Sequence, residues 1–466
     1  MKTLRFFKEK ARDIPVLHEV DVLVGGGGTA GFTAALSAAR LGAKVMIVEK
    51  YGFLGGMCTA GYVTLLPIWN LTPWKDEKGS LIGGIAEEIV DRLDEMGGSV
   101  KASVAARRQA KNPVLPYWPT WFQFDFEAMK ILMQEMLQEV GVRMLLHTYI
   151  AGTIRDGDKV KGLIVENKSG RQAIMSNLTI DCTGDGDVSF FAGASFEKEP
   201  AKTIMPVTLP FYMGNVDSEK AVGYLEKDPG LKRLLDKKGD EIVGEKQVLK
   251  ASVKLALSRV SLPPGQQREK KYAQFDRNGE WYVWGAHSSG KDVTDAYDLT
   301  DAEIETRRKV WKIANFLKRN VPGFEDSYVV TTAAQVGIRE SRRIVGGYVL
   351  TRDDVLKGNH FQDAILRSRT GEWELQPQES PPPFDIPFRC IIPEKLDNLL
   401  VAGRCISMEH EAATFFSPRD ITTCMGLGEV AGAAAVLSLE EKKIPREIDV
   451  TKLQKVLKGN NKRRNR

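Results

Sequence analysis

The stretch DVLVGGGGTAG, residues 21–31, decides the fold because it joins a short apolar run to a helical pattern through a run of glycines. Residues 20–24 form the apolar run, which is typical of a buried strand. Residues 32–41 are rich in alanine and predict a helix. Three glycines between the two elements match the pattern G-x-G-x-x-G. The stretch therefore predicts a strand, a tight turn and a helix in succession.

Each glycine of this pattern has a physical role in binding a dinucleotide. Gly26 permits the tight turn, Gly28 lets the backbone approach a pyrophosphate, and Gly31 lets the helix pack closely on the strand. Thr29 and Ala30 stand where the helix is about to begin. A helix N-terminus offers unpaired N–H groups and a positive dipole end to phosphates.

A second apolar run, residues 44–48, ends in Glu49. Strand, turn, helix and strand thus follow one another within about thirty residues and close on an acid that can accept hydrogen bonds from a ribose hydroxyl. The alternative is a tight turn that binds nothing. We adopt the dinucleotide interpretation, although the spacing alone does not say which dinucleotide binds.

Four further stretches carry a family resemblance: EKYGFLGGMCTAG at 49–61, DCTGDGD at 181–187, GIRESRRIVG at 337–346, and NLLVAGR at 398–404. With the opening glycine stretch, they resemble FAD-dependent oxidoreductases that have a glutathione-reductase-like FAD domain. The resemblance extends more distantly to the fumarate reductase flavoproteins. Gly25 departs from the family pattern, in which a bulky β-branched residue usually stands. Because glycine weakens a strand interior, we expect the first strand to be looser at its end.

The resemblance implies FAD as the cofactor and assigns its contacts. The residues expected to contact FAD are Gly26, Gly28, Thr29, Ala30, Gly31, Glu49, Lys50, Gly55, Gly56, Thr183, Gly184, Asp185, Gly403, Arg404, Thr423 and Cys424. No histidine stands near Gly55 and Gly56, where some relatives bond FAD covalently, so we expect non-covalent FAD. Ser189 occupies the third glycine position after Gly184, so no second dinucleotide fingerprint is present there.

The predicted fold class is α/β: a Rossmann-like FAD-binding domain, with a parallel sheet and a β-meander, into which an α+β substrate or cap domain is inserted. Residues 126–140 have helical spacing, and residues 150–175 alternate between turns, as a meander does. The final helix, 423–439, contains glycines that suit close packing. The boundaries expected are 19–68, 125–198 and 390–446 for the FAD-binding domain, 69–124 and 199–389 for the substrate or cap region, and 447–466 for a basic C-terminal tail.

Three residues are candidates for catalysis. The resemblance places His410 and Arg419 between the last strand and the last helix, on the substrate side of the flavin. A histidine can exchange a proton near neutral pH, and an arginine can hold a carboxylate or developing oxyanion. A structural hydrogen bond is the alternative for His410. Arg339 opens the run RESRR, which is either a solvated run, in which the arginines share a face if it is helical, or an internal ion-pair network near the site.

Composition narrows the class of protein. A chain of 466 residues with 42% hydrophobic residues suits a globular protein of about two to three domains. The charged N-terminus does not resemble a secretory signal, and the chain lacks a long uninterrupted apolar run, so we expect no membrane span. Five scattered cysteines predict reduced thiols and a cytoplasmic location. Cys58 has no close partner, and without CxxC or paired histidines we expect neither a redox disulfide nor a metal site.

The sequence thus predicts an enzyme, an FAD-dependent dehydrogenase, oxidase or reductase that transfers a hydride between a small organic substrate and FAD. Its electron acceptor and oligomeric state are left open. One alternative is an NAD(P)-dependent reductase that uses the first fingerprint without flavin. Another is an FAD-containing protein that binds or modifies RNA through the basic residues of 458–466. We expect those residues to be a solvated end, with nucleic acid an unlikely partner.

Overall fold

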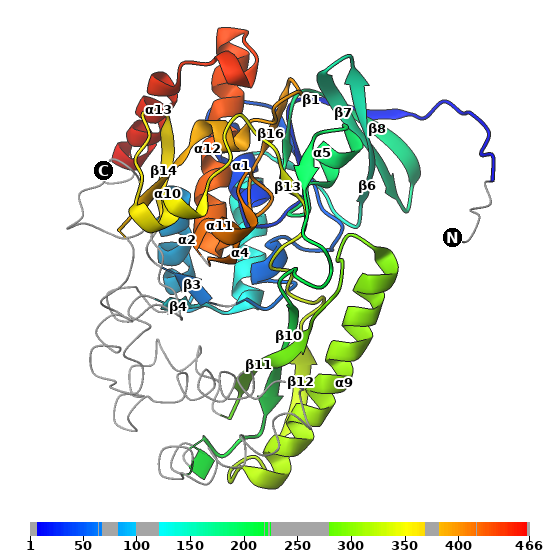
Figure 1. The fold of residues 1–466 in the computed structure, drawn as a ribbon, viewed down its shortest axis with the longest axis vertical. Coiled ribbons are helices and arrows are strands. Elements are labelled where there is room, and N and C mark those ends of the chain that lie inside the picture. The colour runs from blue at the N-terminus through cyan, green and yellow to red at the C-terminus, as the bar shows by residue number, and fades with distance from the viewer. Residues whose placement is uncertain are drawn as a thin grey trace.

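The computed structural model describes residues 7–63, 65–67, 83–98, 121–218, 220–221, 224, 279–368, 382–415 and 417–463. A seven-stranded sheet forms the centre of the main body, with strand order β5-β2-β1-β8-β7-β6 and β16 paired to β8 (Figure 1). The bounds of these strands are β1 Val16–Gly25, β2 Val45–Val48, β5 Arg143–Leu145, β6 Tyr149–Asp156, β7 Lys159–Asn167, β8 Gly170–Asp181 and β16 Leu399–Val401. This sheet confirms the predicted α/β class with a Rossmann-like core.

The first βαβ unit sets the geometry of the sheet. β1 pairs in parallel with β2 on one side and with β8 on the other, and the helix α1 (Thr29–Arg40) connects β1 to β2. The helix begins three residues earlier than the predicted start at Phe32. Every residue of β2 is buried, as expected of a parallel strand covered on both faces.

The prediction of a loose end to β1 is wrong. Gly25 is paired in register with Val48 of β2 and Asp181 of β8. A Cβ at Gly25 would lie 2.8 Å from Cγ2 of Val188 and 3.0 Å from Cδ1 of Ile150. The methyl groups of two side chains thus occupy the space beside Gly25, and a larger residue there would require them to shift.

The predicted β-meander is present and shares its last strand with the parallel sheet. β6, β7 and β8 are antiparallel neighbours. β8 is twelve residues long, so its first half pairs with β7 while its last residues, Thr179 to Asp181, pair in parallel with β16. The carboxyl ends of β1, β8 and β16 consequently meet at one edge of the sheet.

The helix α12 (Ile421–Glu441) packs on α1 at close range. A Cβ at Gly428 would lie 2.0 Å from the carbonyl oxygen of Ala30, and one at Gly432 would lie 2.3 Å from that of Ala34. The hydroxyl of Thr33 donates to the carbonyl oxygen of Met425 across the same contact, at 2.7 Å. The predicted role of these two glycines in helix packing is confirmed.

Further helices cover the same body. They are α2 (Gly84–Glu95), α4 (Phe126–Glu139), α5 (Asp187–Phe191), α10 (Arg352–Lys357), α11 (His410–Thr414) and α13 (Val450–Arg463). Asp125 caps α4, because its side chain accepts the backbone N–H groups of Glu127 and Ala128. Small antiparallel pairs complete the body: β3 (Leu65–Pro67) with β4 (Trp121–Gln123), β9 (Phe196–Glu197) with β13 (Arg343–Ile344), and β14 (Ala364–Ser368) with β15 (Phe384–Pro387).

The C-terminal segment differs from the predicted tail. Residues 450–463 form α13, which contacts α12 and α2, and its Leu453 and Leu457 are buried in the main core. Their spacing of four residues puts both side chains on one face of the helix. The helix is thus packed through these two leucines, and Lys458, which follows them, is exposed.

A separate three-stranded antiparallel sheet, β11-β10-β12, lies below the main body in Figure 1. Its strands are β10 (Val207–Gly214), β11 (Trp281–Ser288) and β12 (Tyr328–Thr332), and the long helix α9 (Ala296–Asn320) lies against it. Leu209, Phe211 and Trp281 join α9 in a second hydrophobic core.

Within the described ranges, one helix, α12, is long and apolar enough to cross a membrane by length and composition, and 94% of its apolar window is buried. Two of its glycines, Gly428 and Gly432, lie against α1, so this apolar surface is used in packing.

Candidate functional site

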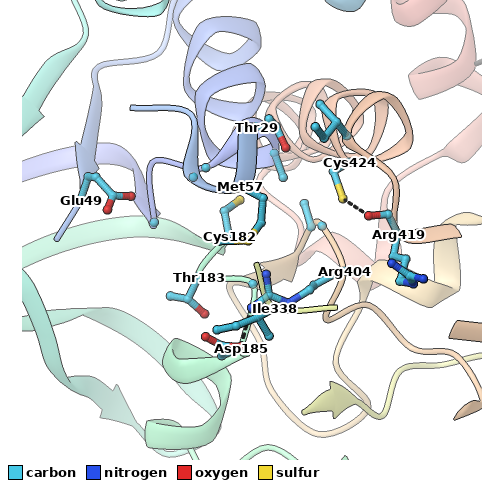
Figure 2. A pocket seen from close by; sticks show the side chains of 18 of the residues that line it. Thr29, Glu49, Met57, Cys182, Thr183, Asp185, Ile338, Arg404, Arg419 and Cys424 are labelled. Carbon is cyan, nitrogen blue, oxygen red and sulfur yellow. Dashed lines mark hydrogen bonds and ion pairs between the residues drawn. The ribbon is translucent and has the colours of Figure 1, made fainter. Parts of the chain in front are cut away.

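A pocket opens where the carboxyl ends of β1, β8 and β16 meet (Figure 2). Its walls come from segments far apart in sequence: the glycine turn, the end of β2, the turn after β8, residues 335–339, the turn after β16 and the start of α12. The lining residues are Gly26, Gly28, Thr29, Ala30, Glu49, Lys50, Tyr51, Gly56, Met57, Cys182, Thr183, Gly184, Asp185, Gln335, Ile338, Arg339, Ala402, Gly403, Arg404, Arg419, Ile421 and Cys424. This is the position at which parallel α/β sheets bind ligands.

The glycines of the turn differ in how much space each leaves for a Cβ atom. Gly26 has a φ of +96°, and a Cβ there would lie 2.5 Å from the carbonyl oxygen of Cys182. A Cβ at Gly31 would lie 1.8 Å from the carbonyl oxygen of Gly26. A Cβ at Gly28 would meet only the Cα of Gly56, at 3.9 Å. Gly26 and Gly31 are thus required by the protein's own packing, whereas Gly28 leaves open space toward the pocket.

Gly28 is also the N-cap of α1, and no side chain caps this helix end. The N–H groups of the first turn therefore face the pocket at Thr29 and Ala30, with the positive end of the helix dipole behind them. This arrangement favours an anionic group, such as a phosphate, beside Gly28.

Glu49 fastens the end of β2 to the glycine turn. One carboxylate oxygen accepts the N–H of Gly27 at 2.6 Å, and the other accepts the N–H of Tyr51 at 2.9 Å. Burial raises the pKa of Glu49, and these two N–H groups oppose that rise. The carboxylate is thereby held in one orientation at the rim of the pocket.

The turn after β8 and the turn after β16 are clasped by an ion pair. Arg404 donates to a carboxylate oxygen of Asp185 at 2.5 Å, and the hydroxyl of Ser341 donates to the same oxygen at 2.6 Å. Burial disfavours the charged form of Asp185, but the attraction of the Arg404 guanidinium outweighs this effect. The pKa of Asp185 consequently lies below its usual range. Arg342 reaches the same turn through the carbonyl oxygen of Asp185, at 3.1 Å.

Two further arginines line the pocket. Arg339 donates to the carbonyl oxygen of Pro206, while Arg419 donates from Nε to the carbonyl oxygen of Ala413 at 2.8 Å. Figure 2 shows the thiol of Cys424 directed at the backbone oxygen of Arg419, a contact of 3.5 Å. Two guanidinium groups in the lining make the pocket suitable for an anionic or carbonyl group.

A partly buried histidine lies near Arg339. The Nδ1 of His287 lies 3.1 Å from the hydroxyl of Thr208, and its carbonyl oxygen accepts Nζ of Lys309 at 2.6 Å. Burial, Arg339 and Lys309 together lower the pKa of His287 to about 3, so the imidazole is neutral at physiological pH.

The start of α12 carries a negative cap. Asp420 is the N-cap, and its side chain accepts the N–H of Thr423 at 2.6 Å and the hydroxyl of Thr422 at 2.9 Å. The N-terminus of α12 carries the positive end of the helix dipole. The carboxylate of Asp420 offsets that dipole and takes one of the free N–H groups.

Residues 339–343 are extended and nearly all buried, which rules out both a helix and a solvated run. Glu340 is the centre of an internal network: it pairs with Arg343, and it accepts Nδ1 of His410 at 2.8 Å. Arg343 also lies 3.3 Å from a carboxylate oxygen of Glu199. The predicted internal ion-pair network is present.

Comparison with known proteins bears on this site. A profile of the family described as FAD dependent oxidoreductase matches residues 21–457, nearly the whole chain. The chain belongs to this family. It is an enzyme, and FAD is its cofactor, which sets aside the alternative of a flavin-free nicotinamide reductase.

Individual relatives of this FAD-dependent oxidoreductase match over shorter stretches. Dihydrolipoyl dehydrogenase of Trypanosoma brucei brucei is 51% identical over 47 residues, 10% of each chain. Thiamine thiazole synthase of Aeropyrum pernix is 29% identical over 159 residues, 34% of this chain and 48% of that protein. The chain therefore spans from a tenth to about half the length of these two relatives.

Solved structures also match this chain, at low identity. A geranylgeranyl bacteriochlorophyll reductase-like protein of Thermoplasma acidophilum has a TM-score of 0.46 and 16% identity, over 95% of this chain and 84% of that chain. The p-nitrophenol 4-monooxygenase of Pseudomonas putida has a TM-score of 0.43 and 13% identity, over 95% and 82%.

The described residues of the oxidoreductase fit FAD. Gly28 leaves a cradle that a Cβ would fill, and the first turn of α1 lies beside it without a side-chain cap. Arg404 lines the same pocket, and its Nε is buried without a hydrogen-bond partner among the described residues. Uncapped N–H groups and a guanidinium around a glycine cradle are the donors that a pyrophosphate requires.

The pocket gathers most of the residues predicted to contact FAD, and the exceptions have identifiable places. Gly31 and Gly55 lie behind the lining, Gly31 against Gly26 and Gly55 as donor to the carbonyl oxygen of Gly27 at 2.8 Å. Thr423 is fully buried, and its hydroxyl lies 3.1 Å from that of Ser368. Of the three catalytic candidates, Arg339 and Arg419 line the pocket, whereas His410 does not.

Several lining residues were missed from the sequence. Tyr51, Met57 and Ile338 lie inside the stretches that carry the family resemblance but were not assigned to the site, and Gln335 and Ile421 lie outside those stretches. The hydroxyl of Tyr51 contacts the side chain of Gln335 although 284 residues separate them. Long-range pairs of this kind have no local pattern.

The cysteines of the oxidoreductase are all free and buried. Burial raises the pKa of the Cys424 thiol to about 12, so this pocket residue is a thiol at neutral pH. Among the described residues, no group of three histidine, cysteine or acidic side chains is placed to hold a metal ion.

Proposed function

We propose that this enzyme oxidises or reduces a small organic molecule that carries a carboxylate or carbonyl group, using non-covalently bound FAD. The observation that carries the proposal is the presence of Arg339 and Arg419 in the same pocket as the glycine turn. FAD supplies hydride transfer at its isoalloxazine ring when bound. The residues of the chain bind, orient and neutralise the reacting molecules.

We propose that different residues of the pocket hold the cofactor and the substrate. The glycine turn, the first turn of α1 and the Asp185–Arg404 clasp would hold the dinucleotide. Arg339 and Arg419 would hold the substrate, because an arginine can donate two parallel hydrogen bonds to a carboxylate. We propose that the region 69–124 and 199–389 covers the substrate, since Arg339 and its backbone acceptor at Pro206 both belong to it.

His410 is better suited to a positioning role than to the proton transfer predicted from sequence. It contacts Glu340, the residue next to Arg339, and lies outside the lining. Glu340 is nearly inaccessible to solvent and also binds Arg343. We propose that His410 fixes Glu340 and, through it, the backbone that presents Arg339 to the substrate.

The test is anaerobic screening of small carboxylates, alcohols, amines and carbonyl compounds for bleaching or reoxidation of the bound flavin. With a substrate in hand, Arg419→Ala is expected to weaken substrate binding about 10–100-fold, because charged hydrogen bonds contribute about 1.5–3 kcal/mol each. Arg419→Lys would not restore binding if the contact is bidentate. Arg389→Ala, at an exposed arginine paired with Asp363, is the matched control.

The positioning role of His410 has its own readout. His410→Ala is expected to raise KM and leave the pH dependence of single-turnover flavin reduction unchanged, and His410→Asn, which keeps a donor near the position of Nδ1, should restore most of the binding. A general acid or base would instead show lost turnover, an altered pH profile and no rescue by Asn.

A further inference from the structure

The outer face of α9 carries three large apolar side chains in a line. Tyr297 is 84% exposed, Ile304 46% and Trp311 64%. Successive members are seven residues apart, and a spacing of seven drifts by only about 20° around an α-helix. The opposite face of α9, with Ala302 and Ile313, packs in the second hydrophobic core, against β10 and β11. Figure 1 shows the helix along the outer edge of the molecule, with β10–β12 on its inner side.

This arrangement is unlike scattered surface apolar residues, which are normal. At a rise of about 1.5 Å per residue, the line is roughly 21 Å long, and it consists of two aromatic residues and an isoleucine. A seven-residue spacing keeps apolar side chains on one face of a helix, where they can contact a second helix lying alongside; it supplies one of the two apolar positions per seven residues found in coiled coils.

The charges of α9 are segregated along its length. The first eleven residues, 296–306, contain four acids and no base, whereas residues 307–320 contain six bases and no acid. Asp301 and Arg308 are themselves seven residues apart, so they form a second line beside the apolar one. The carboxylate of Asp301 is 65% exposed despite a contact of 3.4 Å with Lys291.

We propose that this face of α9 binds the same face of α9 in a second copy of the chain, with the two helices antiparallel and a two-fold axis at Ile304. In that register Tyr297 faces Trp311 of the other copy and Ile304 faces Ile304. Asp301 of each copy falls within one residue, about 1.5 Å, of the level of Arg308 of the other. Such a contact is closed and self-complementary, as two-fold interfaces are.

The charge pattern selects the antiparallel arrangement. In a parallel pair the acidic half of each helix would lie beside the acidic half of the other, and the basic half beside the basic half, and like charges at close range oppose association. In the antiparallel pair the acidic half of each helix faces the basic half of the other. Tryptophan, tyrosine and arginine, all present on this face, are the residues most enriched at interface hot spots.

The size of the face sets the expected strength. An aromatic side chain buries about 150–250 Å² when fully covered, so the partly exposed line would contribute on the order of 600–800 Å² from two copies. With flanking side chains, the total approaches the lower limit of specific interfaces, about 1,200 Å². We therefore expect a reversible dimer with a dissociation constant of roughly 1–100 µM.

The test is sedimentation velocity of the full-length FAD-loaded protein from about 1 to 200 µM, a range that brackets the expected dissociation constant. Wild type is expected to shift from monomer to dimer across this range. Ile304→Glu brings two like charges together at the axis and should weaken the dimer at least tenfold. Ile131→Glu, at a 52% exposed isoleucine on α4, is the matched control and should associate like wild type.

Charge exchange tests the register. Asp301→Arg alone should weaken association, and adding Arg308→Asp to it should restore association, because the two positions face each other across the axis. In a parallel pair the double variant would still oppose like charges. A wild-type protein that remains monomeric throughout, an Ile304→Glu variant that dimerises normally, or a double variant that stays monomeric would overturn the proposal.

Discussion

Alanine substitutions at Gly28 and Gly31 distinguish a glycine that the cofactor needs from a glycine that the folded protein needs. At Gly31 a Cβ would lie 1.8 Å from the carbonyl oxygen of Gly26, so Gly31→Ala must push the turn and α1 apart. At Gly28 the nearest protein atom to a Cβ is the Cα of Gly56, at 3.9 Å, and the backbone angles, φ −65° and ψ −174°, are open to alanine. Gly28→Ala is therefore compatible with the folded protein, and its methyl group points into the cradle.

The magnitudes follow from these distances. Gly31→Ala overpacks the turn and is expected to cost about 1–3 kcal/mol or more of folding stability. Gly28→Ala should cost only a few tenths to about 1 kcal/mol at this N-cap position. If its methyl group displaces a phosphate from two N–H donors, at about 1.5–3 kcal/mol per charged hydrogen bond, FAD affinity falls roughly 10²–10⁴-fold.

The assay is FAD titration of the apoprotein, followed by flavin fluorescence, with thermal unfolding of the same apoprotein as the measure of folding. The expected result is a Gly28→Ala apoprotein with a near-wild-type melting temperature and very weak FAD binding, beside a Gly31→Ala protein impaired in both. Wild-type FAD affinity in a folded Gly28→Ala variant would refute the assignment of the phosphates to this turn.

Three further predictions follow from named contacts. In Glu49→Gln the amide nitrogen must face the N–H of Gly27 or of Tyr51, so FAD titration should show about tenfold weaker binding, at a cost of about 1–2 kcal/mol; unchanged affinity would contradict this. Asp185→Asn leaves Arg404 without its carboxylate and should cost about 3 kcal/mol in denaturant unfolding, against about 1 kcal/mol for Ser341→Ala, and equal effects would count against the clasp. The pKa of His287 is lowered from 6.5 to about 3, so the unfolded chain binds its proton first and the free energy of unfolding falls as pH drops below 6.5, by up to about 1.4 kcal/mol per pH unit. His287→Asn should remove that component from the pH dependence of unfolding, and identical slopes for both proteins would show that the imidazole is not held neutral.

The sequence predicted those parts of the site that local spacing determines. Gly31 lies against Gly26, and the acid after β2 accepts the N–H of Gly27, so the spacing within the first βαβ unit carries their role. DCTGDGD and the GR dipeptide after β16 were found by resemblance, and the ion pair between Asp185 and Arg404 shows why they occur together.

Other features depend on contacts that no local pattern encodes. The Gln335 that meets Tyr51, and the Val188 that occupies the space beside Gly25, come from distant segments. His410, proposed from sequence to exchange a proton, lies between the last strand and the last long helix as the resemblance implied. Its side chain contacts Glu340 and is not part of the pocket lining. Likewise, the electrostatic effect of the α12 dipole on the pocket depends on Asp420, whose carboxylate caps the helix N-terminus.

The central claim is that this pocket holds FAD, and the most direct measurement of it is equilibrium binding of FAD, FMN and NAD⁺ to the apoprotein, with the flavin content of the purified protein determined alongside. If the pocket holds FAD, we expect one FAD per chain, tight rebinding of FAD, and much weaker binding of FMN. FMN lacks the pyrophosphate and adenosine that the glycine turn and Glu49 would hold. Purified protein without flavin that also fails to bind FAD, or that binds NAD⁺ as well as FAD, would contradict it.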